Sequence, residues 1–377
     1  MSDDDDGMSI EDNASSDGSE ADLIEERDRV VAEMYAHTQA WNTQRKYVRE
    51  RMQVAKDDVV NDIPWPDRHY MFVCDYAQTM DLPHFGGEQP GEVYYYSPLN
   101  INVFGTCDYS REVMEAFIYD EGEGKKGGNN VVSMIEMTLK NKGVFKDAKE
   151  KGPGECLTLV FDNCGGQNKN RMVLRYLLYL VESNVFKTVE AVFLVAGHTK
   201  NVCDRLFKEL KRGFHYKNVY TMNQLMSVCN ISGSITPIQC TSNNFFDWDT
   251  YLDRIYSRPA PGTINKNHIF KAVGTKPGVL ITEIIKGQDT KEQNLIKLKK
   301  NATGGQKAAR TRIINGKKIK KEKRPGLREI KQVDLYEKWG PLVPLEFRDE
   351  ICPKPSDKII NSVKEERKTK KNIRKYK

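Results

Sequence analysis

Three aspartates stand where short apolar segments end or where the next helix begins. Asp75 lies in HYMFVCDYAQ, Asp162 directly follows CLTLVF, and Asp204 lies in the helix-compatible stretch after VEAVFLVAG. The ends of neighbouring strands lie side by side in a sheet, so we expect these carboxylates to converge. Three acids around one point repel each other unless a divalent cation neutralises them, and hard oxygen ligands suit Mg²⁺ or Mn²⁺. Two such ions would clamp the attacking and leaving oxygens of a phosphodiester, as in nucleases and strand transferases.

Asp162 and Asp75 also have structural interpretations. Asp162 and Asn163 precede two glycines, which suits a turn or the cap of the next helix. Asp75 has apolar neighbours, and an unpaired carboxylate buried among them would be costly. A salt bridge to Arg68 or to a lysine is therefore its structural alternative.

Asp204 has the weakest individual case of the three. It has the i,i+4 spacing of an exposed helix pair with Lys208. Glu209 is a rival third ligand, although five residues further on it points to a different helix face.

Two polar residues follow the strand VEAVFLVAG, which we expect to end at Gly197. His198 and Thr199 would emerge at the sheet edge where Asp162 should also lie. Thr199 or Asn201 would cap the next helix and place Asp204 in its first or second turn. A lone histidine after a strand is more often a hydrogen-bonded structural residue, so His198 is placed beside the ligand set and not in it.

The order of elements predicts an α/β fold, a mixed sheet with flanking helices. Strand-like runs, a helix, and then strand–helix–strand–helix follow one another, with Asn129 or Asn130 as the expected cap of the first helix. Two strand-like runs are expected around the turn at Ser97–Pro98. We expect an acidic disordered tail (1–21), a basic helical segment (22–60), the α/β domain (68–220), a small α+β extension (221–286), and a basic, largely disordered tail (287–377) with a short ordered segment near 333–351.

Composition excludes several classes of protein. The 377 residues carry a formal net charge of +6, with an acidic start and a lysine-rich end, and no apolar run is long enough to span a bilayer. The eight cysteines include no CxxC pair, which argues against a zinc ribbon and a disulfide scaffold and favours reduced thiols. Such a polarised chain suggests a partner that carries phosphates.

The order β-β-β-α-β-α-β-α, with acids on the first strand, after the fourth strand and on the last helix, resembles the ribonuclease H-like fold of DDE/DDD transposases and retroviral integrases. More narrowly, DYAQTMDLPHF, DNCGGQNKN and GHTKNVCDRLFKELK look like transposon-derived eukaryotic proteins that carry a domain-of-unknown-function label. The resemblance covers about residues 30–275. Related proteins tend to carry an additional, often Cys-rich N-terminal region. An acidic tail stands in that place here, as expected of a truncated or domesticated copy.

The resemblance implies a set of site residues and a mechanism. Asp75, Asp162 and Asp204 would be the catalytic triad and the ligands of two Mg²⁺ or Mn²⁺ ions, which serve cleavage of DNA and then transfer of its 3′-hydroxyl end. Asn163, Gln167 and Asn168 would shape the loop of the second acid, with His198 and Thr199 beside the third. The DNA backbone would be held by two basic faces, each equally consistent with a solvated helix face: Arg45, Lys46, Arg49, Arg51, Arg205, Lys208, Lys211 and Arg212.

The sequence leaves three functions open. The first is a nuclear, metal-dependent transposase or integrase-like strand transferase, and the second is an inactive transposase-derived protein that still binds DNA or other partners. The third is a ribonuclease H-like nuclease that acts on RNA or a hybrid. DNA is the expected partner and a homodimer is a further candidate, whereas neither a membrane nor a small-molecule cofactor is expected. The basic stretches GKKIKKEKRPG and KEERKTKKNIRKYK resemble nuclear localisation signals and equally suit a solubilising tail.

Overall fold

A ten-stranded mixed sheet forms the centre of the protein in this computed structural model, which describes residues 17–87, 89–195, 202–230, 233–297 and 319–375. The strand order is β10-β9-β8-β6-β5-β1-β3-β4-β7, with β2 beside β3. The strands are β1 (His69–Tyr76), β2 (Met80–Leu82), β3 (Leu99–Asp108), β4 (Val113–Asp120), β5 (Gly154–Phe161), β6 (Phe186–Phe193), β7 (Ile235–Gln239), β8 (Ile269–Val273), β9 (Val279–Glu283) and β10 (Lys291–Asn294). Strands β1, β5 and β6 run parallel, and β3 is antiparallel to β1.

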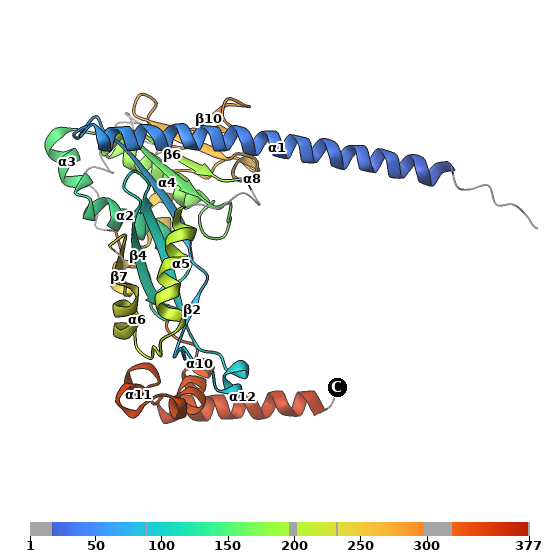
Figure 1. The fold of residues 1–377 in the computed structure, drawn as a ribbon, viewed down its shortest axis with the longest axis vertical. Coiled ribbons are helices and arrows are strands. Elements are labelled where there is room, and N and C mark those ends of the chain that lie inside the picture. The colour runs from blue at the N-terminus through green and yellow to red at the C-terminus, as the bar shows by residue number, and fades with distance from the viewer. Residues whose placement is uncertain (1–16, 88, 196–201, 231–232, 298–318, 376–377) are drawn as a thin grey trace, which may run out of the picture.

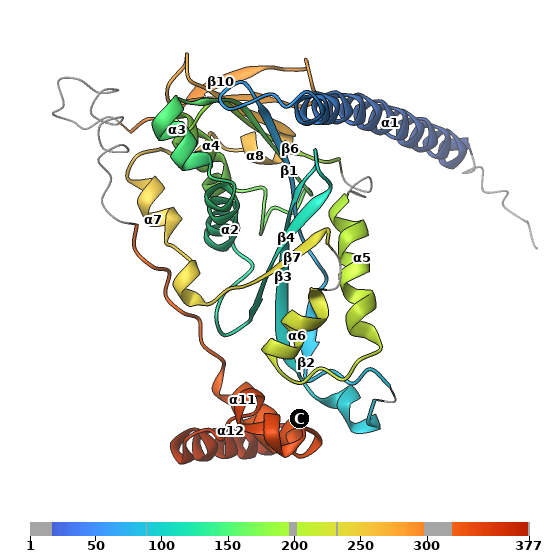
Figure 2. The ribbon, with the colours of Figure 1, turned by 60° about the vertical axis from the view of Figure 1, so that its left-hand side comes forward.

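Helices cover both faces of this sheet (Figure 2). One face carries α2 (Gly128–Asn141), α4 (Arg171–Glu182) and α7 (Trp248–Asp253), and the other carries α5 (Val202–His215), α6 (Met222–Cys229) and the C-terminal half of α1 (Asp17–Val60). Alternate residues of β1 divide between the two cores, with Phe72 and Cys74 on the α2–α4 side and Met71 and Val73 on the α5 side. The protein therefore has the expected α/β fold, and its long elements from β1 to α5 follow the order β-β-β-α-β-α-β-α.

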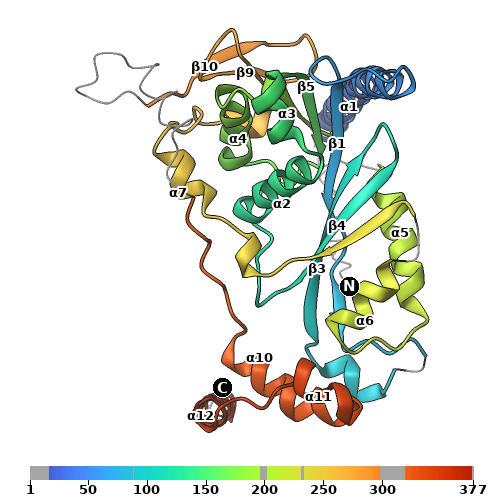
Figure 3. The same cartoon turned by 90° about the vertical axis from the view of Figure 1, so that its left-hand side faces the viewer.

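Shorter elements complete the chain. The remaining helices are α3 (Val144–Lys151), α8 (Thr263–Lys266), α10 (Glu329–Asp334), α11 (Leu345–Ile351) and α12 (Asp357–Lys375), and the 3-10 or π segments are η1 (Gly91–Tyr95), η2 (Ser242–Asn244), η3 (Leu335–Trp339) and η4 (Gly340–Leu342). Figure 3 shows α10, α11 and α12 grouped at one end of the molecule, beyond β3. There the indole nitrogen of Trp339 donates to the carbonyl oxygen of Ser97 at 3.1 Å. Among the described residues, no helix combines the length and apolarity that crossing a membrane requires.

A buried carboxylate attaches the long helix α1 to the sheet. Glu190 of β6 is fully buried, and it accepts hydrogen bonds from the Tyr47 hydroxyl at 2.6 Å and the Thr158 hydroxyl at 2.8 Å. It also pairs with Arg51 at 3.0 Å. Tyr47 precedes Arg51 by four residues on α1. Burial and the neighbouring Glu190 raise the pKa of Tyr47, which keeps its hydroxyl protonated as a hydrogen-bond donor. The C-terminal half of α1 is thereby held on the α5 face, while its N-terminal half projects from the body (Figure 1).

Several expectations for the ends and edges of the fold are wrong. The run before Ser97 is the 3-10 segment η1 and not a strand, with Tyr94 and Tyr95 exposed. Residues 221–286 are not a separate α+β extension, because β8 and β9 continue the main sheet from β6 and β7 pairs with β4. An open sheet edge needs hydrogen-bond partners, and these later strands supply them.

Both tails contain more regular structure than expected. Helix α1 already begins at Asp17, within the segment 1–21 that was predicted to be disordered, and residues 1–16 lie outside the described part of the chain. The C-terminal tail contains β10, α10, α11 and the 19-residue α12. Helix α2 starts after Gly127 without a side-chain cap, and not at Asn129 or Asn130. Strand β6 ends at Phe193, before the expected Gly197.

Replacing Glu190 by alanine should destabilise the fold by about 3–5 kcal/mol, because it leaves Arg51, Tyr47 and Thr158 without their buried partner. Glu155→Ala is the matched control, since Glu155 is also a strand glutamate in an ion pair, with Lys187 at 2.6 Å, but its side chain is exposed. It should cost less than about 1 kcal/mol. Denaturant unfolding followed by circular dichroism measures both values, and equal costs would show that Glu190 does not anchor α1.

Candidate functional site

The register of two parallel strands places Asp75 beside Asp162. Cys74 of β1 lies opposite Phe161, the last residue of β5, and each aspartate is the next residue of its chain. Two residues before them, Val73 and Val160 both belong to the core under α5. If the alternation continues, both carboxylates leave the same edge of the sheet on the α5 face. Both aspartates are partly exposed.

Helix α5 lies against the sheet beside Asp75. The thiol of Cys203 donates to the carbonyl oxygen of Val73 at 3.2 Å, which fixes the first turn of the helix on β1. Gly105 of β3 is the register partner of Asp75, and a Cβ there would lie 2.8 Å from the ring of Phe207. Only glycine permits this close approach. Asp204 stands in the first turn of α5, between these two contacts.

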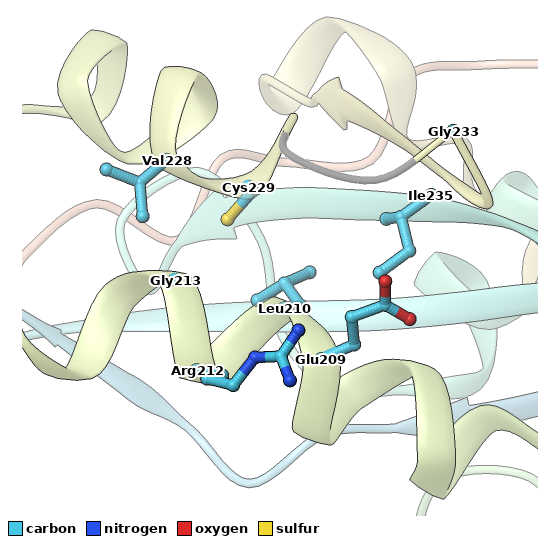
Figure 4. A pocket seen from close by; sticks show the side chains of 8 residues that line it. All are labelled: Glu209, Leu210, Arg212, Gly213, Val228, Cys229, Gly233 and Ile235. Atoms are coloured by element: carbon cyan, nitrogen blue, oxygen red, sulfur yellow. The ribbon is translucent and has the colours of Figure 1, made fainter.

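The two sides of α5 separate Asp204 from its rival Glu209. Glu209 lines a cavity of about 400 Å³ between α5, α6 and β7, together with Arg212 (Figure 4). On the other side of the helix, Lys211 shares a face with Asp204 because they are seven residues apart. The Lys211 ammonium donates to the Gln78 side-chain oxygen at 3.2 Å, just beyond the end of β1. Asp204 therefore lies on the side where Asp75 and Asp162 emerge, and Glu209 does not.

The DNCGGQNKN loop folds back on itself to hold Asp162. The carbonyl oxygen of Cys164 accepts the backbone N–H groups of Gln167 at 3.3 Å, of Asn168 at 2.9 Å and of Lys169 at 2.9 Å. The turned loop brings the fully buried Asn168 amide to Asp162 Oδ1 at 2.5 Å. Asn168 is therefore the loop residue that orients the second acid.

Two of the structural alternatives for these acids differ from what the fold uses, namely Asp162 as the cap of α4 and Arg68 as the partner of Asp75. Asn170, and not Asp162, caps α4, because its side-chain oxygen accepts from the backbone N–H groups of Met172 at 3.0 Å and Val173 at 3.2 Å. Arg68 lies before the start of β1, at the opposite end from Asp75, and its Nη2 is buried without a hydrogen-bond partner. Asn163 is partly exposed in the bend after Asp162, and the Gln167 carbonyl accepts the Asn170 amide at 2.8 Å.

Two residues at this edge were not predicted from the sequence as site residues. The side chain of Gln44 on α1 donates to the Phe193 carbonyl at 2.8 Å and accepts from the Val195 N–H at 2.7 Å. Gln44 thus supplies hydrogen-bond partners to the backbone groups at the end of β6. Lys169 is only 5% exposed, with its ammonium 3.4 Å from the Asn265 carbonyl. The amide-rich run around Lys169 looks like an exposed turn, so no local signal indicates its burial.

The acids offer a suitable donor set but not a closed ligand shell. Asp75, Asp162 and Asp204 supply the carboxylate oxygens that Mg²⁺ and Mn²⁺ prefer. Within the described ranges, however, no three His, Cys, Asp or Glu side chains lie close enough together to hold a metal ion. His198 and Thr199 lie outside the described residues. The residues that would bind an ion are thus at one edge, and binding requires their carboxylates to draw together.

The predicted DNA-binding residues have different environments. Arg45 and Arg49 of α1 and Arg205 of α5 line one cavity of about 640 Å³, so the two basic faces meet. Arg51 pairs with Glu190 inside the fold and does not belong to this surface. Lys46 and Lys208 are exposed, whereas Arg212 lies beside Glu209 on the far side of α5.

Comparison with known proteins gives a family without an assigned activity. The architecture defines the protein as an α/β protein whose mixed sheet presents carboxylates at the C-terminal ends of parallel strands. The chain belongs to the family described as a domain of unknown function, DUF7869, whose model matches residues 93–288. That range includes Asp162 and Asp204 and begins after Asp75. No curated protein and no solved structure matches the chain.

Lys169 should make stability depend on pH in the alkaline range. Burial lowers the pKa of Lys169 from 10.5 to about 8, so between these values the folded chain binds fewer protons than the unfolded chain. The free energy of unfolding should therefore rise with pH across this window, relative to Lys169→Met, which has no such charge. Below pH 8 the free energy of unfolding of Lys169→Met should exceed that of the wild type by the largest amount. Urea unfolding of both proteins at several pH values tests this, and a pH-independent difference would contradict it.

Binding of Mn²⁺ should stabilise the folded protein if the acids share an ion. At 100 times the dissociation constant, the gain in free energy of unfolding is about 2.7 kcal/mol. Asp162→Ala should lose this gain, and Glu209→Gln, a change to an acid on the other side of α5, should keep it. Thermal unfolding with and without Mn²⁺ is the measurement. Retention of the full gain in Asp162→Ala would rule out Asp162 as a ligand.

Proposed function

We propose that this protein cleaves and transfers DNA strands as a transposase or integrase-like enzyme of the DDE/DDD type, with a ribonuclease H-like domain. The observation that supports this most strongly is the register that makes Asp75 and Asp162 neighbours at the ends of β1 and β5. The order of the long elements and the position of Asp204 on α5 agree with it. Paired carboxylates on rigid strands are the usual requirement for metal-dependent phosphodiester chemistry.

Each residue has a distinct part in this proposal. Asp75, Asp162 and Asp204 would hold two Mg²⁺ or Mn²⁺ ions, which supply activation of water and neutralisation of charge on the phosphate. Asn168 orients the Asp162 carboxylate through its 2.5 Å hydrogen bond. The Cys203 and Phe207 contacts hold α5 so that Asp204 stays at the same edge. Partners of this kind normally change activity by about 10–100-fold when they are removed.

The substrate in this proposal is DNA, bound through its phosphates. Arg45, Arg49 and Arg205 border the cavity beside the acids, and the exposed Lys208 lies one turn after Asp204. Such contacts position the backbone without reading its sequence. A nuclear location and a homodimer belong to the same proposal. The nuclear location is proposed because of the basic C-terminal stretches.

A second candidate function is an inactive, transposase-derived protein that binds DNA. One observation favours it, namely that the described residues contain no group of three acids, histidines or cysteines close enough to hold a metal. The basic cavity would serve this function equally well, since phosphate binding requires no metal. Activity assays separate the two candidates.

Metal-dependent nicking of labelled duplex DNA is the test of the proposed enzyme. With Mn²⁺ the wild-type chain should nick DNA, and EDTA should abolish the activity. Asp75→Asn, Asp162→Ala and Asp204→Asn should each lower the rate by more than about 100-fold, beyond the loss expected for a residue that only supports a ligand. Glu209→Gln is the matched control on the same helix and should retain activity. Nicking that survives in Asp162→Ala, or no nicking by a wild-type chain that still binds DNA, would exclude the enzymatic proposal.

A further inference from the structure

A groove between α1 and α5 lies on the sheet face of the three aspartates. Its floor consists of Val73, Val160 and Leu194, from β1, β5 and the residue after β6. Val73 and Val160 precede Asp75 and Asp162 by two residues, a step of about 7 Å along a strand. The groove has a volume of about 640 Å³, within the range of pockets that hold one small organic ligand. It therefore opens beside the acids and has its own apolar floor.

The rim of this groove is positively charged. Arg45 and Arg49 of α1 and Arg205 of α5 border it, and all three are exposed. Among its described lining residues the only carboxylate is Glu112, which pairs with Arg205 at 2.5 Å and with Lys56 at 3.1 Å. Hydrogen bonds from these two cations lower the pKa of Glu112 and keep it ionised. The excess of cations makes an anionic ligand complementary to the rim.

Two aromatic side chains from different parts of the chain line the groove. Trp41 comes from α1 and Tyr109 from the turn between β3 and β4, and both are partly exposed. The Arg45 guanidinium lies 5.2 Å from the centre of the Trp41 ring, and the Lys56 ammonium lies 5.3 Å from that of Tyr109. Each ring is thus combined with a cation. This combination of aromatic surface and positive charge is typical of sites that bind unpaired nucleotides.

We propose that this groove binds an unpaired segment of a nucleic-acid strand. Different bases of the segment pack on the apolar floor, one against Trp41 and another against Tyr109, and the flanking phosphates contact Arg45, Arg49 and Arg205. A duplex has the same phosphates, but its base faces are stacked inside the helix and cannot reach the apolar floor. An unpaired strand exposes both chemical features at once.

The inference deepens the proposed function. It rests on that function only for the statement that the bound strand reaches the catalytic acids. A nucleotide in the groove would place a neighbouring phosphodiester near Asp75 and Asp162, so the enzyme would act where a strand is unpaired. Binding in the groove itself requires neither metal nor catalysis. It can therefore be measured in EDTA.

Fluorescence anisotropy of labelled oligonucleotides tests this inference in the full chain. Oligothymidylate should bind at least about tenfold more tightly than a blunt duplex of the same length, as the gain from one stacked base implies. Trp41→Ala should weaken oligothymidylate binding by about 5- to 150-fold, whereas Trp41→Phe should stay close to wild type because it keeps an aromatic face. Trp65, Trp248 and Trp339 are buried, so binding should also quench mainly the fluorescence of Trp41.

A pair of neighbouring cations on α1 supplies the matched control. Arg45→Ala should weaken binding and reduce the salt dependence by about 0.7 in the slope of log K against log salt. Lys46→Ala removes the same charge one residue further on, where the side chain does not line the groove, and should leave oligothymidylate binding nearly unchanged. Equal losses in the two variants would mean that only the general charge of α1 attracts DNA, and the inference would be wrong.

The remaining outcomes also decide the question. Equal affinity for duplex and single strand, or unchanged binding in Trp41→Ala, would overturn the groove as a site for unpaired bases. Tighter binding of oligouridylate than of oligothymidylate would support the site and identify RNA as its ligand, and the reverse order would identify DNA. Binding with these properties in a chain that does not nick DNA would support the groove while the proposed catalytic function fails.

Discussion

The parallel pairing of β1 with β5 is the constraint on which the candidate site depends. The two strands are about eighty residues apart in the chain, and only their register determines which residues become neighbours. Because Cys74 lies opposite Phe161, the next residues on the two chains are both aspartates. A shift by one residue would turn one carboxylate to the other face of the sheet, toward the α2–α4 core. Close packing of both strands against the helix layers on the two faces resists such a shift.

Two further contacts build on this pairing from the α5 face. Gly105 lets Phe207 come close to β3, and the Cys203–Val73 contact fixes the first turn of α5 on β1. Helix α1 is held on the same face by the buried Glu190. The groove between α1 and α5 exists because both helices are attached to the sheet independently. Its cations and the aspartates are therefore separate features that share one edge.

Some elements could be read from the sequence because their pattern is local. Apolar runs predicted β1, β5 and β6, and helical spacing predicted α1, α4 and α5. Other features depend on partners far along the chain. The strands β8 and β9 were recognisable, but nothing local shows that they pair with the edge of β6 and not with each other alone. The cap of α4 is a similar case, since Asp162 and Asn163 suited a cap by residue type, whereas the structure uses Asn170.

The sequence by itself determined the α/β class, the three aspartates as candidates, and the basic residues near 45 and 205. These follow from residue type and short-range periodicity, which are properties of the chain alone. Only the tertiary structure decided that Asp75 and Asp162 are neighbours, that Asp204 and not Glu209 lies on their side, and that Arg51 is an internal ion pair. It also brought Trp41 and Tyr109 to one groove. Register, helix docking and burial arise from contacts between distant segments, which no local pattern records.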